Sequence, residues 1–133
     1  MKITNGECFI IENGLKTAAE ELRVSKTKNL VLNVIVSKNL SKIADTCHLF
    51  REEIGKFKPE ELIAYEKSDS ELSDEDNLIK EDLLKSYNVE INKFLAESSD
   101  IDFLVSDIKL SSLVGIEMEY DTSSIVGLMI SAK

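Results

Sequence analysis

The sequence is poor in the side chains that build most recognisable active sites. It has one histidine, His48, one proline, two cysteines and no tryptophan in 133 residues. A single histidine is too few for the common zinc sites, and the sequence contains no HExxH, CxxC, GxSxG or phosphate-binding GxxxxGKS/T motif. These absences disfavour the enzyme classes that depend on such motifs. We therefore expect a protein without enzymatic activity, metal or cofactor.

The two cysteines, Cys8 and Cys47, follow no metal-binding spacing. Both fall on predicted apolar stripes, so a packing role in a reducing compartment fits them better than a disulfide. Aromatic residues are few, which leaves Ile, Leu and Val to build the core. No run approaches the ~20 apolar residues that a membrane span needs, and Glu7 and Glu12 interrupt the N-terminal stretch. We therefore expect a cytoplasmic protein.

Two local patterns come near to functional motifs but fail on spacing. Cys47 and His48 are adjacent, and neighbours on a helix point about 100° apart, so they do not converge as a nucleophile and its base must. We expect His48 to be a surface residue. Asp74 to Asn77 lacks the alternating ligand positions, the glycine and the final glutamate of an EF-hand calcium loop.

Charge is distributed unevenly along the chain. The net charge is −9, but residues 1–57 carry nine Lys and Arg against seven acids, whereas residues 58–133 carry seven Lys against eighteen acids. Such a negative field repels nucleic acid phosphates and anionic membranes, so we expect direct binding of neither. A partner protein with a basic surface would be attracted instead.

The strongest structural signal is an apolar seam with heptad spacing. Its members follow one another at steps of four and three residues: Val36, Leu40, Ile43, Cys47, Phe50, Ile54 and Phe57. This spacing predicts a long helix that ends near Lys56. The preceding residues 30–36 fit either the first turns of that helix, with Asn29 as N-cap, or a buried strand, and the N-cap favours the helix.

A first helix is expected over residues 6–23. Thr4 and Glu7 form a capping-box pattern before it. Its apolar stripe again follows steps of three and four: Cys8, Ile11, Leu15, Ala18 and Leu22. Asn13-Gly14 is also a common hairpin turn, but the stripe continues past it with helical spacing, so a continuous helix is favoured.

Residues 59–77 read as an acidic connector, with a short helix possible at residues 60–66. A second long helix begins at Asp76 or Asn77, with an apolar stripe at Leu84, Tyr87, Ile91 and Phe94. Two stripes joined by such a connector predict a long antiparallel helical hairpin.

The remainder of the chain carries strand signals. Residues 101–110 are strand-like with a change of apolar phase, which indicates either a bulge near Ser106 or a strand buried on both faces. Residues 116–120 alternate as a half-exposed strand, and a short helix capped by Asp121 or Thr122 extends through Ile130. Ile3 is a possible edge. The expected fold is a single domain, residues 1–133, of the α+β class, mainly helical, with a small C-terminal β-sheet.

The order of these signals resembles a family of small uncharacterised proteins from bacteriophages and prophages of Gram-positive bacteria. The resemblance rests on the opening residues 1–7, on residues 36–40 leading into the long helix, and on residues 108–113. The chain lacks a proline that we would expect near Val24 and Ser25. The resemblance implies an origin in a mobile element and a helical fold, and it supplies no catalytic residue.

The acidic connector provides the candidate partner-binding residues. These are Asp69, Glu71, Leu72, Asp74, Glu75 and Asp76, with Leu72 as the apolar anchor. A plain solvated tether is the simpler interpretation of the same stretch. The favoured function is a phage-encoded protein in the host cytoplasm that binds a host protein, inhibiting a nucleic-acid-handling defence system through its acidic surface. The alternative is a virion or assembly accessory protein that acts by homo-oligomerisation.

Overall fold

The computed structural model describes residues 1–67 and 71–132, and it is a mainly helical α+β fold, as the sequence predicts. Within those residues the helices are α1 (Asn5–Val24), α2 (Leu30–Lys56), α3 (Glu60–Glu66), α4 (Asp74–Ala96), the 3₁₀ turn η1 (Leu110–Leu113) and α5 (Tyr120–Gly127). The strands are β1 (Lys2–Thr4), β2 (Ser98–Asp100), β3 (Ser106–Ile108) and β4 (Ile130–Ala132).

Helix α1 begins at the predicted capping box. The Glu7 backbone N–H donates to Thr4 Oγ1, and the Thr4 N–H donates to Glu7 Oε1, each at 3.1 Å. The helix continues through Asn13-Gly14 without a turn. Gly14 gives α5 room, because a Cβ at this position would lie 2.2 Å from Ile125 Cδ1 of α5 and the Ile125 side chain would have to shift. The glycine that argued against a helix in the sequence therefore allows α5 to pack closely against it.

Helix α2 includes residues 30–36, so the helical interpretation of that segment is correct. Asn29 caps it by accepting the Leu32 N–H at 3.0 Å. Along the predicted seam, burial decreases towards the C-terminus: Val36, Ile43 and Cys47 are fully buried, whereas Phe50 is half-buried and Phe57 is exposed. The second half of α2 therefore leaves the core.

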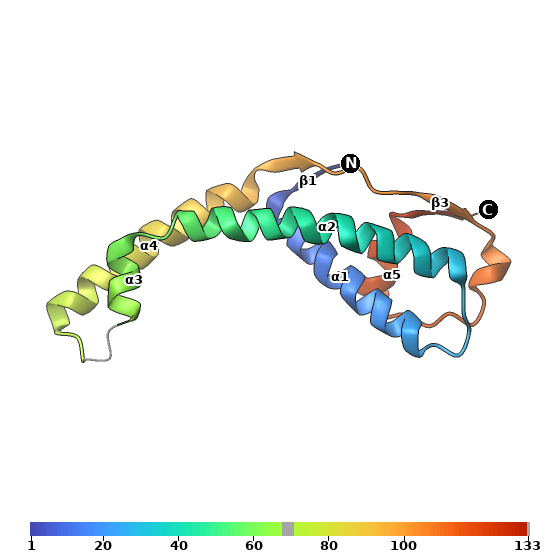
Figure 1. Cartoon of the computed structure of the whole chain (residues 1–133), viewed down its shortest axis with the longest axis horizontal. Helices are drawn as coiled ribbons and strands as arrows, with labels where there is room; N and C mark the ends of the chain where they lie inside the picture. Colours follow the sequence, from blue (N-terminus) through green and yellow to red (C-terminus); the bar gives the residue numbers. More distant parts are fainter. Residues whose placement is uncertain (68–70, 133) are drawn as a thin grey trace.

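Helix α1 lies along the first half of α2, a pairing that the sequence did not predict, whereas the predicted pairing of α2 with the second long helix, α4, is confined to the last turns of α2. Helices α1 and α2 form an antiparallel hairpin joined by residues 25–29 (Figure 1). Helix α4 packs against the C-terminal part of α2, where Phe94 contacts Phe50 and Phe57 at ring distances of 5.4 and 5.8 Å. The Tyr87 hydroxyl of α4 also donates to Ile54 O at 3.2 Å. The short loop makes α1 the nearer partner, and its own buried stripe fills the interface.

Helix α4 begins at Asp74, with Ser73 as N-cap, slightly earlier than predicted. None of its residues is fully buried. Its packed face contains Tyr87, Ile91 and Phe94 as expected, but Leu83 is half-buried in place of Leu84, which is exposed. This face is correspondingly loosely covered.

The strands form two separate pairs. β1 pairs antiparallel with β2, and β3 pairs parallel with β4, so Ile3 lies in the first pair and not at the edge of a C-terminal sheet.

Residues 101–105 were expected to form a strand, but they pair with no other strand. Asn39 of α2 bonds their backbone instead: its Nδ2 donates to Leu104 O at 2.9 Å and its Oδ1 accepts the Leu104 N–H at 2.8 Å.

The predicted strand over residues 116–120 is wrong. Ile116 and Met118 pack against the core from an extended loop, so their alternation reflects one-sided burial without a strand partner. The last helix is α5, which ends at Gly127, and Ile130 belongs to β4 and not to the helix.

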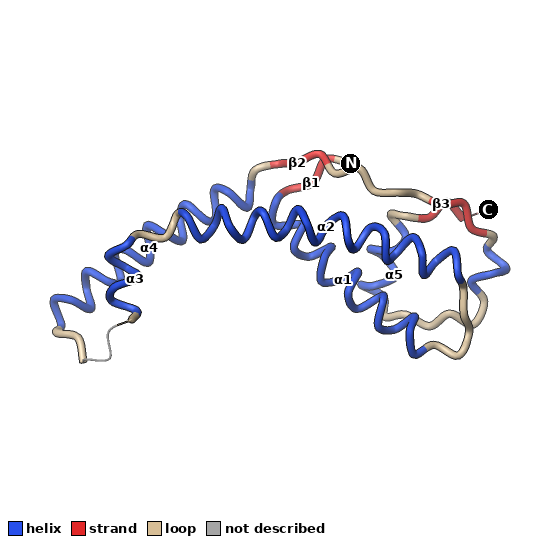
Figure 2. Tube along the Cα trace, viewed as in Figure 1, coloured by secondary structure: helices blue, strands red, loops and turns tan. Residues whose placement is uncertain are grey.

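The molecule is elongated (Figures 1 and 2). The core lies at one end, between α1, the first half of α2 and α5. From it extends an arm, which we define as residues 51–67 and 71–93, with α3 and the start of α4 at its tip. Within the described part of the arm, Leu62 of α3 is the buried hydrophobic side chain that fixes the tip.

Candidate partner-binding surface

The tip of the arm is strongly acidic. Residues 60–82, which we call the acidic end, carry ten acidic residues and two lysines. Helix α3 and the first turns of α4 lie together there, at the end of the molecule that is remote from the C-terminus (Figure 1). Because Leu62 faces inward and is fully buried, α3 presents its charged residues to the solvent.

The structure places five of the six candidate binding residues together, on the approach to α4 and in its first turn. Glu71, Asp74 and Glu75 are exposed. Leu72 and Asp76 are half-buried. Asp69 lies outside the described residues.

Part of this acidity stabilises the helix. The Asp76 N–H donates to Ser73 Oγ at 3.1 Å, so Ser73 caps α4, and three acidic residues occupy the first turn. Negative charge near a helix N-terminus is favourable because the first N–H groups carry partial positive charge. The charge therefore has a structural use, but α4 needs far less than ten acids to gain it.

Acids from two helices converge around Tyr65 of α3. Partial burial raises the pKa of the Tyr65 phenol, and the charges of Asp76, Glu61 and Glu75 raise it further. The acidic end is thus a folded surface in which α3 and α4 contribute to one negative field.

Most of these acids lack a nearby cation. Lys58 pairs with Glu66, and its ammonium lies 5.9 Å from the Tyr87 ring centre. Among the described residues of the acidic end, Glu66 is the one carboxylate within ion-pair distance of a basic group. The others keep their charge available to a partner.

Sequence reasoning missed two residues of this surface, Tyr65 and Leu78. The Leu78 side chain is 63% exposed and follows the acids of the first turn of α4. Helical phase was the available signal, because Leu78 lies on the opposite side of the helix from Tyr87. An exposed Leu78, and not the half-buried Leu72, is the better apolar contact for a partner.

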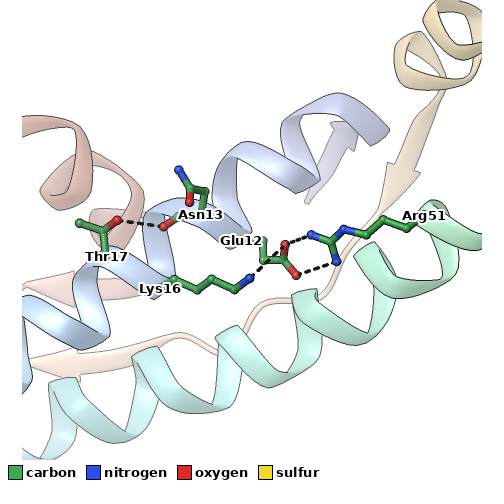
Figure 3. A network of polar contacts seen from close by, with 5 residues as sticks. All are labelled: Glu12, Asn13, Lys16, Thr17 and Arg51. Carbon is green, nitrogen blue, oxygen red and sulfur yellow. Dashed lines mark hydrogen bonds and ion pairs between the residues drawn. The ribbon is translucent and has the colours of Figure 1, made fainter. Parts of the chain in front are cut away.

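A second polar cluster lies in the α1–α2 interface (Figure 3). Glu12 is almost fully buried and accepts two hydrogen bonds from Arg51, one of them at 3.5 Å from Nη1, while Lys16 Nζ lies 3.7 Å from its Oε1. The Arg51 guanidinium also lies 5.3 Å from the centre of the Phe9 ring. Every charge in this cluster is paired within the chain, so the cluster joins two helices and leaves no group free for catalysis.

Cys47 and His48 point in different directions, as predicted. Cys47 is fully buried, and burial, followed by the charge of Glu12 and the thiol of Cys8, raises its pKa to about 11. His48 is exposed, with Nε2 3.1 Å from Glu52 Oε1. A protonated, buried thiol is a poor nucleophile, and this pair has no catalytic geometry.

Several hollows lie at the core end. One of about 500 Å³ lies between residues 21–27 and the Gly115 turn, and one of about 200 Å³ has largely apolar walls between α2 and α5. Over residues 1–67 and 71–132, no group of three or more His, Cys, Asp or Glu is placed to hold a metal ion. Of the helices in those same ranges, none has both the length and the apolar character to cross a membrane.

No protein-family model, curated protein or solved structure matches this chain.

Proposed function

We propose that this protein is a binding protein that contacts a partner protein with a basic surface through its acidic end. The observation that carries the proposal is the set of carboxylates in the described part of the acidic end, of which Glu66 alone has a cation within ion-pair distance, and which project on an arm away from the core. An exposed apolar side chain, Leu78, lies among them. Protein interfaces combine a few apolar contacts with a charged rim in this way.

The sign of the charge selects the class of partner. A negative surface speeds the encounter with a positive one and repels phosphate backbones. The resemblance to phage proteins supports a host protein as the target. In this proposal the acidic end occupies the basic channel of a nucleic-acid-handling defence enzyme in the host cytoplasm and inhibits it.

Capture from host lysate tests the proposal. Immobilised wild-type protein is expected to retain a basic protein that high salt releases, and a variant with Glu71→Gln, Asp74→Asn and Glu75→Gln is expected to retain less than about a tenth as much. The matched control removes three charges from the core end through Glu117→Gln, Glu119→Gln and Asp121→Asn. Equal capture by both variants, or none above background by the wild type, would count against the proposal.

An assembly accessory protein is the second candidate. It is favoured by exposed apolar residues on the first turns of α2, which lie far from the acidic end. Under this alternative the protein should be present in purified phage particles. Its absence from particles would dispose of the virion form of the alternative.

A further inference from the structure

The first two turns of α2 are apolar on both sides. Six of the seven residues in 30–36 are Leu, Val or Ile. The inward side chains, Leu32, Ile35 and Val36, are buried in the core, whereas the outward ones, Leu30, Val31 and Val34, are 77%, 49% and 41% exposed. A helix that is apolar all round is normally covered on both sides, so the fold leaves this outer face without its cover.

The outer face continues as an uncharged stripe. Leu30, Val34, Ser37 and Ser41 follow one another at steps of four, three and four residues, and all four are exposed. Such steps place side chains in one line along a helix, here over about 16 Å. The stripe has large side chains in its first half and small ones in its second.

We propose that a second copy of this chain covers the stripe, with the two α2 helices packed antiparallel. A two-fold axis between Val34 and Ser37 puts Leu30 of each copy opposite Ser41 of the other, and Val34 opposite Ser37. Large side chains then meet small ones, which permits close approach of the helices. An isologous contact of this kind uses the same patch on both copies.

The accessible surface of the chain is larger than that of a compact monomer. The accessible area is 8761 Å², whereas a compact monomer of 14.9 kDa exposes about 7,000 Å². The excess is about twice the ~800 Å² that each partner buries in a standard interface. The elongated arm contributes to this excess, and a contact at residues 30–41 would leave that arm exposed.

Charge also favours a second copy at this place over one at the arm. The acidic end of one copy repels the acidic end of another, but it lies at the far end of the molecule from residues 30–41 (Figure 1). Antiparallel α2 helices direct the two arms away from each other. The dimer then presents two separate acidic ends, without depending on what those ends bind.

Sedimentation equilibrium of the full chain tests the dimer. The wild type is expected to have twice the 14.9 kDa mass of one chain, and Val34→Glu, which puts a charge at the centre of the contact, is expected to weaken association at least about a hundredfold. Val89→Glu is the matched control, because Val89 is 51% exposed on α4, outside the stripe. Helical circular dichroism and a thermal melt of each variant show that it is folded.

A second variant, Leu30→Glu, should act in the same direction as Val34→Glu. A wild type that remains monomeric over the whole concentration range would overturn the proposal, and so would a dimer that persists in folded Val34→Glu. Dissociation by Val89→Glu and not by Val34→Glu would overturn it by placing the contact on the arm.

Discussion

At the scale of single residues, the Glu12–Arg51 pair connects the two helices of the hairpin. We expect Arg51→Ala to lower the free energy of unfolding by about 2 kcal/mol, because it leaves Glu12 buried with only Lys16 at 3.7 Å. The control is Arg23→Ala, which breaks the exposed Arg23–Glu20 pair and should cost no more than about 0.5 kcal/mol. Urea denaturation measures both, and equal losses would show that burial of Glu12 is unimportant.

At Gly14, intrinsic helix propensity and tertiary packing predict opposite changes in stability on substitution by alanine. Propensity alone predicts that Gly14→Ala stabilises α1 by about 1 kcal/mol. We expect destabilisation of about 1 kcal/mol or more, because the new methyl group would meet Ile125. Gly55→Ala, in α2, meets no atom within 4 Å and should stabilise by about 0.5 kcal/mol. Thermal melts of both variants measure these changes. Stabilisation by Gly14→Ala would contradict the close packing of α5 on α1.

Cys47 makes the stability of the protein depend on pH at the alkaline end. Its pKa is raised from 9.0 to about 11, so the folded state holds a proton that the unfolded state releases as the pH passes 9. The contribution of Cys47 to the free energy of unfolding is therefore complete below pH 9 and is lost as the pH rises towards 11. Urea titrations at intervals across that range should show a smaller loss for Cys47→Ala than for the wild type. If the free energy of unfolding fell equally with pH in the wild type and in Cys47→Ala, Cys47 would not be the cause of the pH dependence.

At the scale of elements, Asn39 decides the conformation of residues 101–105. Its fully buried side chain takes both backbone groups of Leu104, so this extended segment lies along α2 and not in a sheet. Asn39→Ala leaves those groups without partners and should cost about 2 kcal/mol. Hydrogen exchange should increase at Leu104, with little change within the β1–β2 pair. An unchanged exchange rate at Leu104 would mean that Asn39 does not hold the segment.

The helices could be predicted from the sequence because their signals are local. The capping box at Thr4, the N-cap Asn29 and the seam of α2 all lie within a few residues of the structure that they specify. The strands could not be predicted in the same way. Short strands such as β1 and β2 pair residues that lie far apart in the sequence. Period-two alternation at residues 116–120 is also produced by an extended loop packed on one side.

At the scale of the whole molecule, pairing between elements was the least predictable feature. The sequence predicted that the stripe of α4 covers the seam of α2, but α1 covers the first half of α2, joined to it by the buried Glu12–Arg51 pair, and α4 covers only the last turns. The candidate site was predictable as a charged segment. Its organisation was not, because the convergence of Glu61 and Asp76 on Tyr65 depends on how α3 packs against α4.

The shape of the molecule gives the acidic end its significance. Packing of α1 against the first half of α2 leaves the second half to extend from the core, and α3 and α4 complete an arm whose tip is its most acidic part. An arm of this kind reaches into a concave partner more easily than a charged patch on a flat face.

Site-specific photo-crosslinking in host lysate tests most directly whether the acidic end contacts a basic host protein. A photoreactive residue replaces Leu78 at the acidic end or, as the control, Val114, which is also exposed but lies at the core end. The account predicts a crosslinked product with a basic host protein from position 78 and none from position 114. A host protein crosslinked from position 114 alone, or from neither position, would contradict it.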